Sequence, residues 1–263
     1  MQLSGKWVLV TGASSGLGSE VARALARDHG ANPILVARRR ERLEDLATEL
    51  RDKHGVEAIT IAADLSRPED VDRVFDESTE GREVHAAVLN AGVTHFGDNR
   101  ELDWETFETL LATNVTSSVR LSSRFVPYLV DRDGGGAIMF VTSLAGLVPV
   151  PYQTAYSATK AFMTTYGQGL YHELSKENVS VTTFAPGGIA TAMAEPLNFE
   201  GPFADLQTQS AEEVARVALR AMIGREYLRV PGLVNRLQLF LPRLVPRRLA
   251  TAIVAKTYRK LLS

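Results

Sequence analysis

The chain has 263 residues, of which 45% are hydrophobic and 23% charged, with a net charge of −2. These values are typical of a soluble globular protein and fit one large α/β domain or two small ones. There is no cysteine, which excludes disulfides and thiolate metal sites, and the five histidines show no metal-ligand spacing, so we expect no bound metal.

Short apolar runs alternate along the chain with longer amphipathic stretches. The predicted strands are residues 7–11, 33–37, 58–62, 86–90, 137–142, 180–185 and 226–230. The predicted helices are residues 16–28, 40–53, 68–79, 103–130, 153–176 and 211–222. Alternating strands and helices are typical of a parallel sheet covered on both faces. We therefore expect a single-domain, Rossmann-type doubly wound α/β fold of about seven strands.

The first predicted strand ends in a glycine-rich turn that consists of Gly12, Ala13, Ser14, Ser15, Gly16, Leu17 and Gly18. Such a turn lets the backbone approach a pyrophosphate at a helix N-terminus, where free N–H groups favour anions. The alternative is a tight packing turn without a ligand. The same residues match the nucleophile elbow of α/β-hydrolases, with Ser14 as the nucleophile. We rank a hydrolase far lower, because the sequence has no His-Gly-Gly-Gly oxyanion segment.

The second predicted strand is followed by Arg38, Arg39 and Arg40, with no acidic residue before Glu41. An NAD site usually has an acidic residue about 20 positions past the glycine turn, whereas an arginine pairs with a 2′-phosphate. We therefore expect NADP(H) rather than NAD(H), with Arg38 as the first choice for the phosphate contact and Arg39 as the second. The alternative is the basic start of a solvated helix.

A phenol and an ammonium lie four positions apart on the predicted helix 153–176, at Tyr156 and Lys160, and Ser143 precedes them. Positions i and i+4 share one face of a helix. A cation beside a phenol favours the phenolate and lowers its pKa, so Tyr156 is suited to moving a proton at a carbonyl. The pair alone could arise by chance among seven Tyr and six Lys.

With the glycine turn, Ser143, Tyr156 and Lys160 in this order, the chain resembles the short-chain dehydrogenase/reductase family of NAD(P)-dependent oxidoreductases. The resemblance covers roughly residues 6–193. It extends to the segment Asn90-Ala91-Gly92 at the end of the fourth strand, to Asn114 in the next helix, and to Pro186, Gly187 and Thr191 after the sixth strand.

The resemblance implies a role for each matched residue. Tyr156 would be the general acid/base, Lys160 would lower its pKa and hold the nicotinamide ribose, and Ser143 would polarise the substrate oxygen. Asn114 would anchor a water on a proton path through Lys160, or else bond only to backbone. Asp64 would contact adenine, or else cap the helix that begins near Pro68. Further expected cofactor contacts are Leu65, Asn90, Ala91, Gly92, Pro186, Gly187, Ile189 and Thr191.

The irregular stretch 186–209 is rich in Gly and Pro and long for a connection, which is typical of a binding loop. Together with Ser143, it is expected to form an apolar substrate pocket. The expected lining residues are Leu144, Val150, Tyr152, Met193 and Phe199. We assign residues 1–230, including this loop, to the dinucleotide-binding catalytic domain.

The C-terminal segment differs in charge from the rest of the chain. Residues 227–263 contain eight Lys and Arg and no Asp or Glu, which leaves 21 basic and 31 acidic residues, a net charge of −10, for residues 1–226. We expect residues 231–263 to be a basic, apolar helical extension packed on the same domain. It could cover the substrate mouth, contact a second subunit or touch an anionic membrane surface.

These patterns predict an NADP(H)-dependent oxidoreductase that interconverts a carbonyl and a secondary alcohol on an apolar small molecule. The alternative is a catalytically weak NADP(H)-binding regulatory or scaffold protein of the same fold. The N-terminus leaves no room for a signal peptide, and no apolar run is long enough to span a membrane. We expect a cytoplasmic protein that does not bind nucleic acid, has peripheral membrane contact at most, and is a homo-oligomer, a dimer rather than a tetramer.

Overall fold

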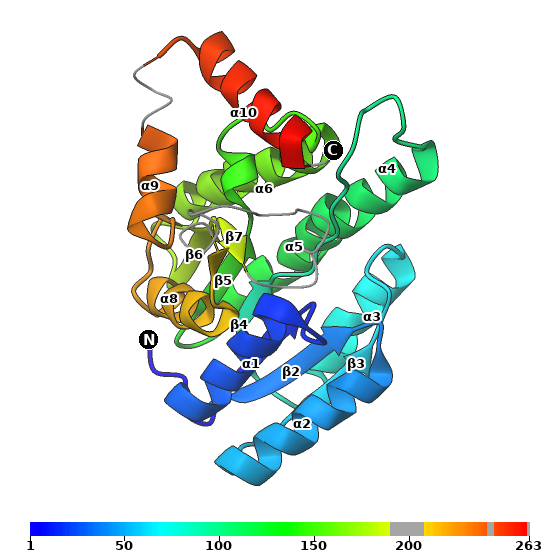
Figure 1. Cartoon of the computed structure of the whole chain (residues 1–263). Coiled ribbons are helices and arrows are strands. Elements are labelled where there is room, and N and C mark those ends of the chain that lie inside the picture. Colours follow the sequence, from blue (N-terminus) through cyan, green and yellow to red (C-terminus); the bar gives the residue numbers. More distant parts are fainter. Residues whose placement is uncertain (190–207, 241–244, 262–263) are drawn as a thin grey trace.

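A parallel sheet of seven strands forms the centre of the computed structural model, which describes residues 1–189, 208–240 and 245–261 (Figure 1). The strand order is β3-β2-β1-β4-β5-β6-β9, and each neighbouring pair is parallel. The strands are β1 (Trp7–Thr11), β2 (Asn32–Ala37), β3 (Ile59–Ala62), β4 (Val84–Leu89), β5 (Gly136–Val141), β6 (Val179–Phe184) and β9 (Leu228–Arg229). The doubly wound fold predicted from the sequence is therefore confirmed, with each strand boundary within two residues of its prediction.

Helices cover both faces of this sheet. On one face, α1, α2 and α8 pack against the strands, and α3, α5 and α6 pack on the other. The helices are α1 (Gly16–His29), α2 (Arg40–His54), α3 (Pro68–Thr79), α4 (Trp104–Leu111), α5 (Ser117–Val130), α6 (Thr154–Glu173), α8 (Ala211–Ile223), α9 (Leu233–Phe240) and α10 (Arg247–Leu261).

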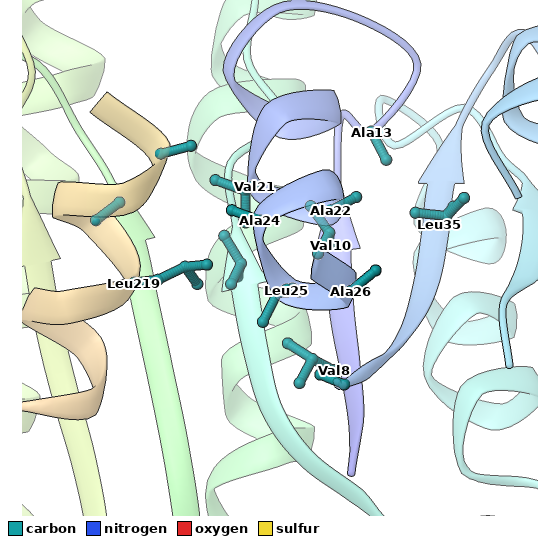
Figure 2. Close-up of a cluster of buried hydrophobic side chains, with 14 of the residues drawn as sticks. Val8, Val10, Ala13, Val21, Ala22, Ala24, Leu25, Ala26, Leu35 and Leu219 are labelled. Atoms are coloured by element: carbon teal, nitrogen blue, oxygen red, sulfur yellow. The ribbon is translucent and has the colours of Figure 1, made fainter. Parts of the chain in front are cut away.

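Alternation along the strands divides the core into two parts. In β1, Val8 and Val10 point to the face covered by α1 and α8, whereas Leu9 points to the opposite face. Figure 2 shows Val8 and Val10 packed against Leu25 of α1, with Leu219 of α8 on the other side of that helix. Full burial of each aliphatic side chain of this size contributes about 1.5–3 kcal/mol, so these two layers fix the sheet that supports the site.

The helix predicted over residues 103–130 is present as a continuous helical stretch, but it is not α-helical throughout. The structure has α4, a π-helical turn at Ala112–Thr116, and then α5. Asp103 caps α4, because its carboxylate accepts a hydrogen bond of 2.7 Å from the Thr106 N–H. A π-turn keeps the backbone helical and changes the residue spacing only locally, so the apolar pattern did not reveal it.

The stretch 186–209 is not irregular throughout, contrary to the sequence-based expectation. Two short parallel strands, β7 (Gly188–Ile189) and β8 (Thr208–Gln209), pair with each other and form a second, small sheet. Ile189 lies opposite Gln209 in this pairing. The two ends of the stretch are therefore held side by side, and residues 190–207 lie outside the described part of the chain.

The C-terminal segment is attached to the main body by polar contacts. Asn235 of α9 is buried, and its amide donates to the Pro231 carbonyl at 2.8 Å and to the Gln209 side chain at 3.0 Å. Arg259 of α10 donates to the Tyr152 hydroxyl at 2.9 Å. Figure 1 shows α9 and α10, in orange and red, at the outside of the molecule. None of the helices in the described ranges is both long and apolar enough to cross a membrane.

Candidate active site

A large cavity lies at the carboxyl ends of the central strands, with a volume of about 1520 Å³. In a doubly wound sheet, ligands bind at this edge, where the strand order reverses between β1 and β4. Most of the residues singled out in the sequence meet there. The cavity is lined by Gly12, Ser14, Ser15, Gly16, Leu17, Arg38, Arg39, Asp64, Leu65, Asn90, Ala91, Gly92, Ser143, Leu144, Val150, Tyr156, Lys160, Pro186, Gly187 and Ile189.

The glycine turn needs its glycines for close backbone approach. Gly12 has a φ of +70°, and a Cβ added to Gly18 would lie 2.3 Å from the Gly12 carbonyl oxygen. The Asn90 amide, which follows β4, donates to the Thr11 carbonyl at 2.9 Å. At the start of α1, the N-cap Ser15 makes no side-chain capping bond. The first N–H groups of α1 are therefore not capped by that side chain, and Gly16 and Leu17 of this turn line the cavity, as suits anion binding at a helix N-terminus.

Arginines border this turn. The Arg39 guanidinium donates to the Ser14 hydroxyl at 2.8 Å and to the Ser15 hydroxyl at 2.7 Å. Partial burial, together with the charges of Arg42 and Arg38, lowers the pKa of Arg39. Within residues 1–189, 208–240 and 245–261, none of these three arginines forms a salt bridge with a carboxylate. A cluster of positive charges that forms no salt bridge is suited to binding an anion.

Asp64 lines the cavity and does not cap α3, so the capping alternative was wrong. The N-cap of α3 is Arg67, and the Asp64 carboxylate accepts from the Ser66 N–H at 3.0 Å and from its hydroxyl at 2.8 Å. Burial acts to raise the pKa of Asp64, but the bonds from Ser66 and the charge of Arg38 lower it on balance. A charged Asp64 therefore faces the cavity beside Arg38.

Ser143, Tyr156 and Lys160 converge on one wall. Ser143 follows β5 and accepts a hydrogen bond of 3.1 Å from the Ala145 N–H at the start of a short 3₁₀ helix. A hydrogen bond between the hydroxyls of Ser143 and Tyr156 acts to lower the pKa of Tyr156. Lys160 lies one turn further along α6, and its ammonium is 5.8 Å from the Tyr156 ring centroid.

The pKa values of Tyr156 and Lys160 differ from those expected from the sequence. Enclosure of the hydroxyl raises the pKa of Tyr156 to about 12, so the expected lowering by Lys160 was wrong for this structure. Burial lowers the pKa of Lys160 to about 8, and its ammonium donates to the Val141 carbonyl at 3.0 Å rather than to the phenol. Desolvation is the largest cause of the pKa shift of both groups.

Asn114 is buried in the π-helical turn. Its side-chain oxygen accepts a hydrogen bond of 2.8 Å from the Val93 N–H, and its side-chain nitrogen donates one of 2.9 Å to the Val93 carbonyl. The same amide donates to the Thr159 hydroxyl on α6 at 3.0 Å. A Cβ added to Gly92 would lie 3.2 Å from both the Asn114 oxygen and the Lys160 ammonium. Asn114 thus holds the segment after β4 against the helix that carries Tyr156.

The expected substrate-side residues separate into three groups. Leu144 and Val150 line the cavity. Tyr152 is absent from the lining among the described residues; its φ is +65° and its hydroxyl accepts from Arg259. Met193 and Phe199 lie outside the described residues, as does Thr191, which was predicted as a cofactor contact.

The helix α10 provides one wall of the cavity, as the first of the three roles considered for the C-terminal extension requires, but the sequence reasoning did not name its lining residues. Seven of its described residues line the cavity: Arg247, Ala250, Thr251, Ile253, Val254, Thr257 and Tyr258. The charge of Tyr258 also acts to raise the pKa of Tyr156, so the two phenols are near each other. The spacing i, i+3, i+4, i+7 and i+11 in residues 247–258 was the available signal.

A doubly wound sheet with a glycine turn and a Tyr-Lys pair at its switch point defines a nucleotide-dependent oxidoreductase. The chain belongs to the short-chain dehydrogenase family, whose model matches residues 6–223.

Individual proteins support this assignment. The very-long-chain 3-oxoacyl-CoA reductase of Homo sapiens is 32% identical over 196 residues, which cover 73% of this chain and 62% of that protein. The chain thus matches less than two thirds of the length of that relative.

Two solved structures are also similar. A short-chain dehydrogenase from Sphingobium yanoikuyae in complex with NADPH is 32% identical, with a TM-score of 0.80 over 91% of this chain and 93% of that chain. A structure described for 7beta-hydroxysteroid dehydrogenase stereoselectivity has a TM-score of 0.87 over 97% of this chain and 99% of that one; at 24% identity, it shows the fold alone.

Proposed function

We propose that the chain is an NADP(H)-dependent oxidoreductase that interconverts a carbonyl and a secondary alcohol on an apolar small molecule. The observation that carries this proposal is the convergence of Ser143, Tyr156 and Lys160 on one wall of the cavity. The glycine turn and Arg39 form the neighbouring wall. The relatives named as 3-oxoacyl-CoA reductases also support reduction of a carbonyl on an apolar chain.

The residues around the glycine turn fit a dinucleotide phosphate. Added Cβ atoms at Gly12 and Gly18 would collide with Asn90 and with the Gly12 carbonyl, so the close-packed turn requires glycine at both positions. The arginines beside the turn form no salt bridge with a carboxylate of the described residues. Arg39, supported by the hydroxyls of Ser14 and Ser15, would hold a 2′-phosphate, and Arg38 would add its charge beside Asp64. The NADPH complex of the Sphingobium yanoikuyae dehydrogenase supports this preference. When bound, NADP(H) supplies the hydride.

Side chains of the protein carry out the proton transfer. Tyr156, held protonated by its raised pKa, donates its proton to the carbonyl oxygen during reduction. In the oxidation direction, the phenolate form of Tyr156 would accept the proton of the alcohol. Ser143 donates a hydrogen bond to the same oxygen and stabilises the charge that develops on it. Lys160, anchored on Val141, presents its positive charge on this wall and favours the phenolate that follows proton transfer.

A serine hydrolase that uses Ser14 finds little support. The Ser14 hydroxyl accepts hydrogen bonds from Arg39, and the described lining of the cavity contains no histidine. A nucleophilic serine needs an adjacent general base, which a guanidinium does not provide.

The test is a panel of lipophilic ketones with NADPH, followed by NADPH absorbance, for the wild type, Tyr156→Phe and Ser14→Ala. We expect turnover by the wild type and a loss of about 10²–10⁴-fold in kcat for Tyr156→Phe, with retained NADPH binding. Tyr171→Phe, on the same helix α6, is the matched control and should retain activity. NADPH binding without turnover on any ketone would favour the regulatory alternative instead. Ester cleavage lost in Ser14→Ala would favour the hydrolase.

A further inference from the structure

Exposed large hydrophobic side chains are concentrated near the C-terminus. Eleven such side chains occur in the described part of the chain, and six of them lie between residues 233 and 253. We call these six the apolar ridge: Leu233, Leu237, Phe240, Val245, Leu249 and Ile253. Their exposed fractions range from 37% to 71%. So many exposed apolar side chains within a short stretch of chain indicate an interaction site.

The spacing of the ridge residues places them on common helix faces. Leu233, Leu237 and Phe240 follow the i, i+4, i+7 pattern on α9, and Leu249 and Ile253 are four residues apart on α10. On α10, Ala250 and Val254 line the cavity without belonging to the ridge, whereas Ile253 belongs to both. The ridge and the cavity therefore meet on α10.

The ridge reaches the rim of the cavity. Val245 and Ile253 are 37% and 58% exposed, and both also line the cavity. An apolar molecule held at the ridge would meet the cavity without crossing a polar surface.

Positive charge surrounds the ridge. Residues 227–263 contain no Asp or Glu. The exposed cations Arg236, Arg247, Arg248 and Lys256 form no salt bridge with any carboxylate of the described ranges. Arg236 lies within one helical turn of Leu233 and Phe240, and Lys256 within one turn of Ile253.

The positive charge around the ridge indicates which partner binds there, a second copy of the chain or a lipid surface. A second copy placed ridge to ridge would bring two sets of cations together, and like charges across an interface suppress binding. An anionic lipid surface offers the opposite charge to the cations and an acyl boundary to the apolar side chains.

We propose that the apolar ridge and its surrounding cations form a docking surface for an anionic lipid bilayer, on which the protein lies peripherally. The proposal goes beyond the proposed reaction and does not depend on it. Docked in this way, the rim at Val245 and Ile253 faces the headgroup and acyl boundary, so apolar substrates enter the cavity from the lipid.

The experiment is co-sedimentation of the full chain with vesicles of phosphatidylcholine, with and without phosphatidylserine. We expect binding to the vesicles that contain phosphatidylserine and a loss at raised salt. The variant Leu233→Ser/Leu237→Ser/Leu249→Ser, which changes no cavity-lining residue, should bind about tenfold more weakly or worse. Arg236→Gln/Lys256→Gln should lose about fivefold for each charge removed.

Matched controls carry the same changes on other surfaces. Trp104→Ser/Phe162→Ser removes side chains that are 69% and 50% exposed on α4 and α6, and Lys53→Gln/Lys176→Gln removes two exposed cations. Both controls should bind like the wild type. Because all the changed side chains are exposed, circular dichroism and thermal unfolding of each variant should match the wild type.

Three results would overturn the proposal. The first is no binding of the wild type to either vesicle, and the second is an equal loss in the control variants. The third is a wild-type dimer, seen by analytical ultracentrifugation, that the ridge variant converts to monomer; the ridge would then be an interface between copies. None of these readouts uses turnover, so they are independent of the reaction assigned above.

Discussion

The Lys160 ammonium donates a hydrogen bond of 3.0 Å to the carbonyl oxygen of Val141, the last residue of β5. Ser143 follows two residues later, and Tyr156 lies one turn before Lys160 on α6. The bond therefore ties the helix that carries the phenol to the strand that leads to the serine. A Cβ added to Gly146 would lie 2.6 Å from the Lys160 carbonyl oxygen, so the same two segments also pack closely through their backbones.

Burial of Lys160 predicts a pH-dependent effect on stability. Its folded pKa is about 8, below the ordinary value of 10.5, so the unfolded state binds more protons between these two values. The contribution of Lys160 to the free energy of unfolding is thus unfavourable below pH 8 and is relieved as the pH rises toward 10.5. We expect the stability of Lys160→Met, relative to wild type, to fall by on the order of 1–2 kcal/mol between pH 7 and pH 10. Urea unfolding at both pH values measures this, with Lys176→Met as the exposed control; a constant difference would contradict it.

Arg39 is expected to control the choice between NADPH and NADH. Because its guanidinium lies on the hydroxyls of Ser14 and Ser15, Arg39→Ala should raise the KM for NADPH about tenfold or more. The KM for NADH should change by less than about threefold, since NADH has no 2′-phosphate. Arg40→Ala removes a neighbouring exposed arginine outside the described cavity lining and should change neither value. Equal losses for both cofactors in Arg39→Ala would place the 2′-phosphate elsewhere.

Gly18 tests the close approach at the glycine turn. A methyl group there meets the Gly12 carbonyl oxygen at 2.3 Å, so Gly18→Ala should cost about 1–3 kcal/mol in the free energy of unfolding and weaken NADPH binding. Gly169→Ala on α6 is the control, because no atom lies within 4 Å of the added methyl group. That variant should be more stable by about 0.5–1 kcal/mol. Chemical denaturation and fluorescence titration with NADPH measure both effects; an unchanged Gly18→Ala would refute the role of this contact.

The wall formed by α10 is expected to limit substrate size. Val254 lines the cavity, so Val254→Trp should reduce kcat/KM for bulky ketones about tenfold more than for small ones. Ala252→Trp places the same side chain at an exposed position of α10 that does not line the cavity, and should leave the ratio unchanged. The ratio of kcat/KM values over a series of ketones is the measurement. A uniform loss across the series would indicate disruption of α10 rather than a narrower cavity.

The strands and most helices could be predicted because their signals are local. β1 is a short apolar run that ends at Thr11 before glycines, and α2 repeats leucines at helical spacing from Leu43 to Leu50. The glycine turn, Ser143, Tyr156 and Lys160 could be assigned to one site because residues at the carboxyl ends of parallel strands meet at one edge of the sheet.

Other features depend on the environment in three dimensions. The π-helical turn at Asn114 leaves the helical pattern intact, so only the backbone reveals it. The direction of the Tyr156 pKa depends on enclosure and on the position taken by Lys160, which i, i+4 spacing does not specify. The cavity-facing role of Val254 and Tyr258 depends on how α10 returns to the sheet edge. The cytoplasmic location and the homo-oligomer remain predictions.

The pairing of Gly188–Ile189 with Thr208–Gln209 has a consequence for how the protein can change. Both attachment points of residues 190–207 are fixed to each other, and Gln209 is further held by Asn235. A change of length or composition between these two strands therefore need not displace β6 or α8, because the pairing holds both attachment points in place. The fold thus has one position at which the chain can diverge between related proteins while the residues around Tyr156 keep their arrangement.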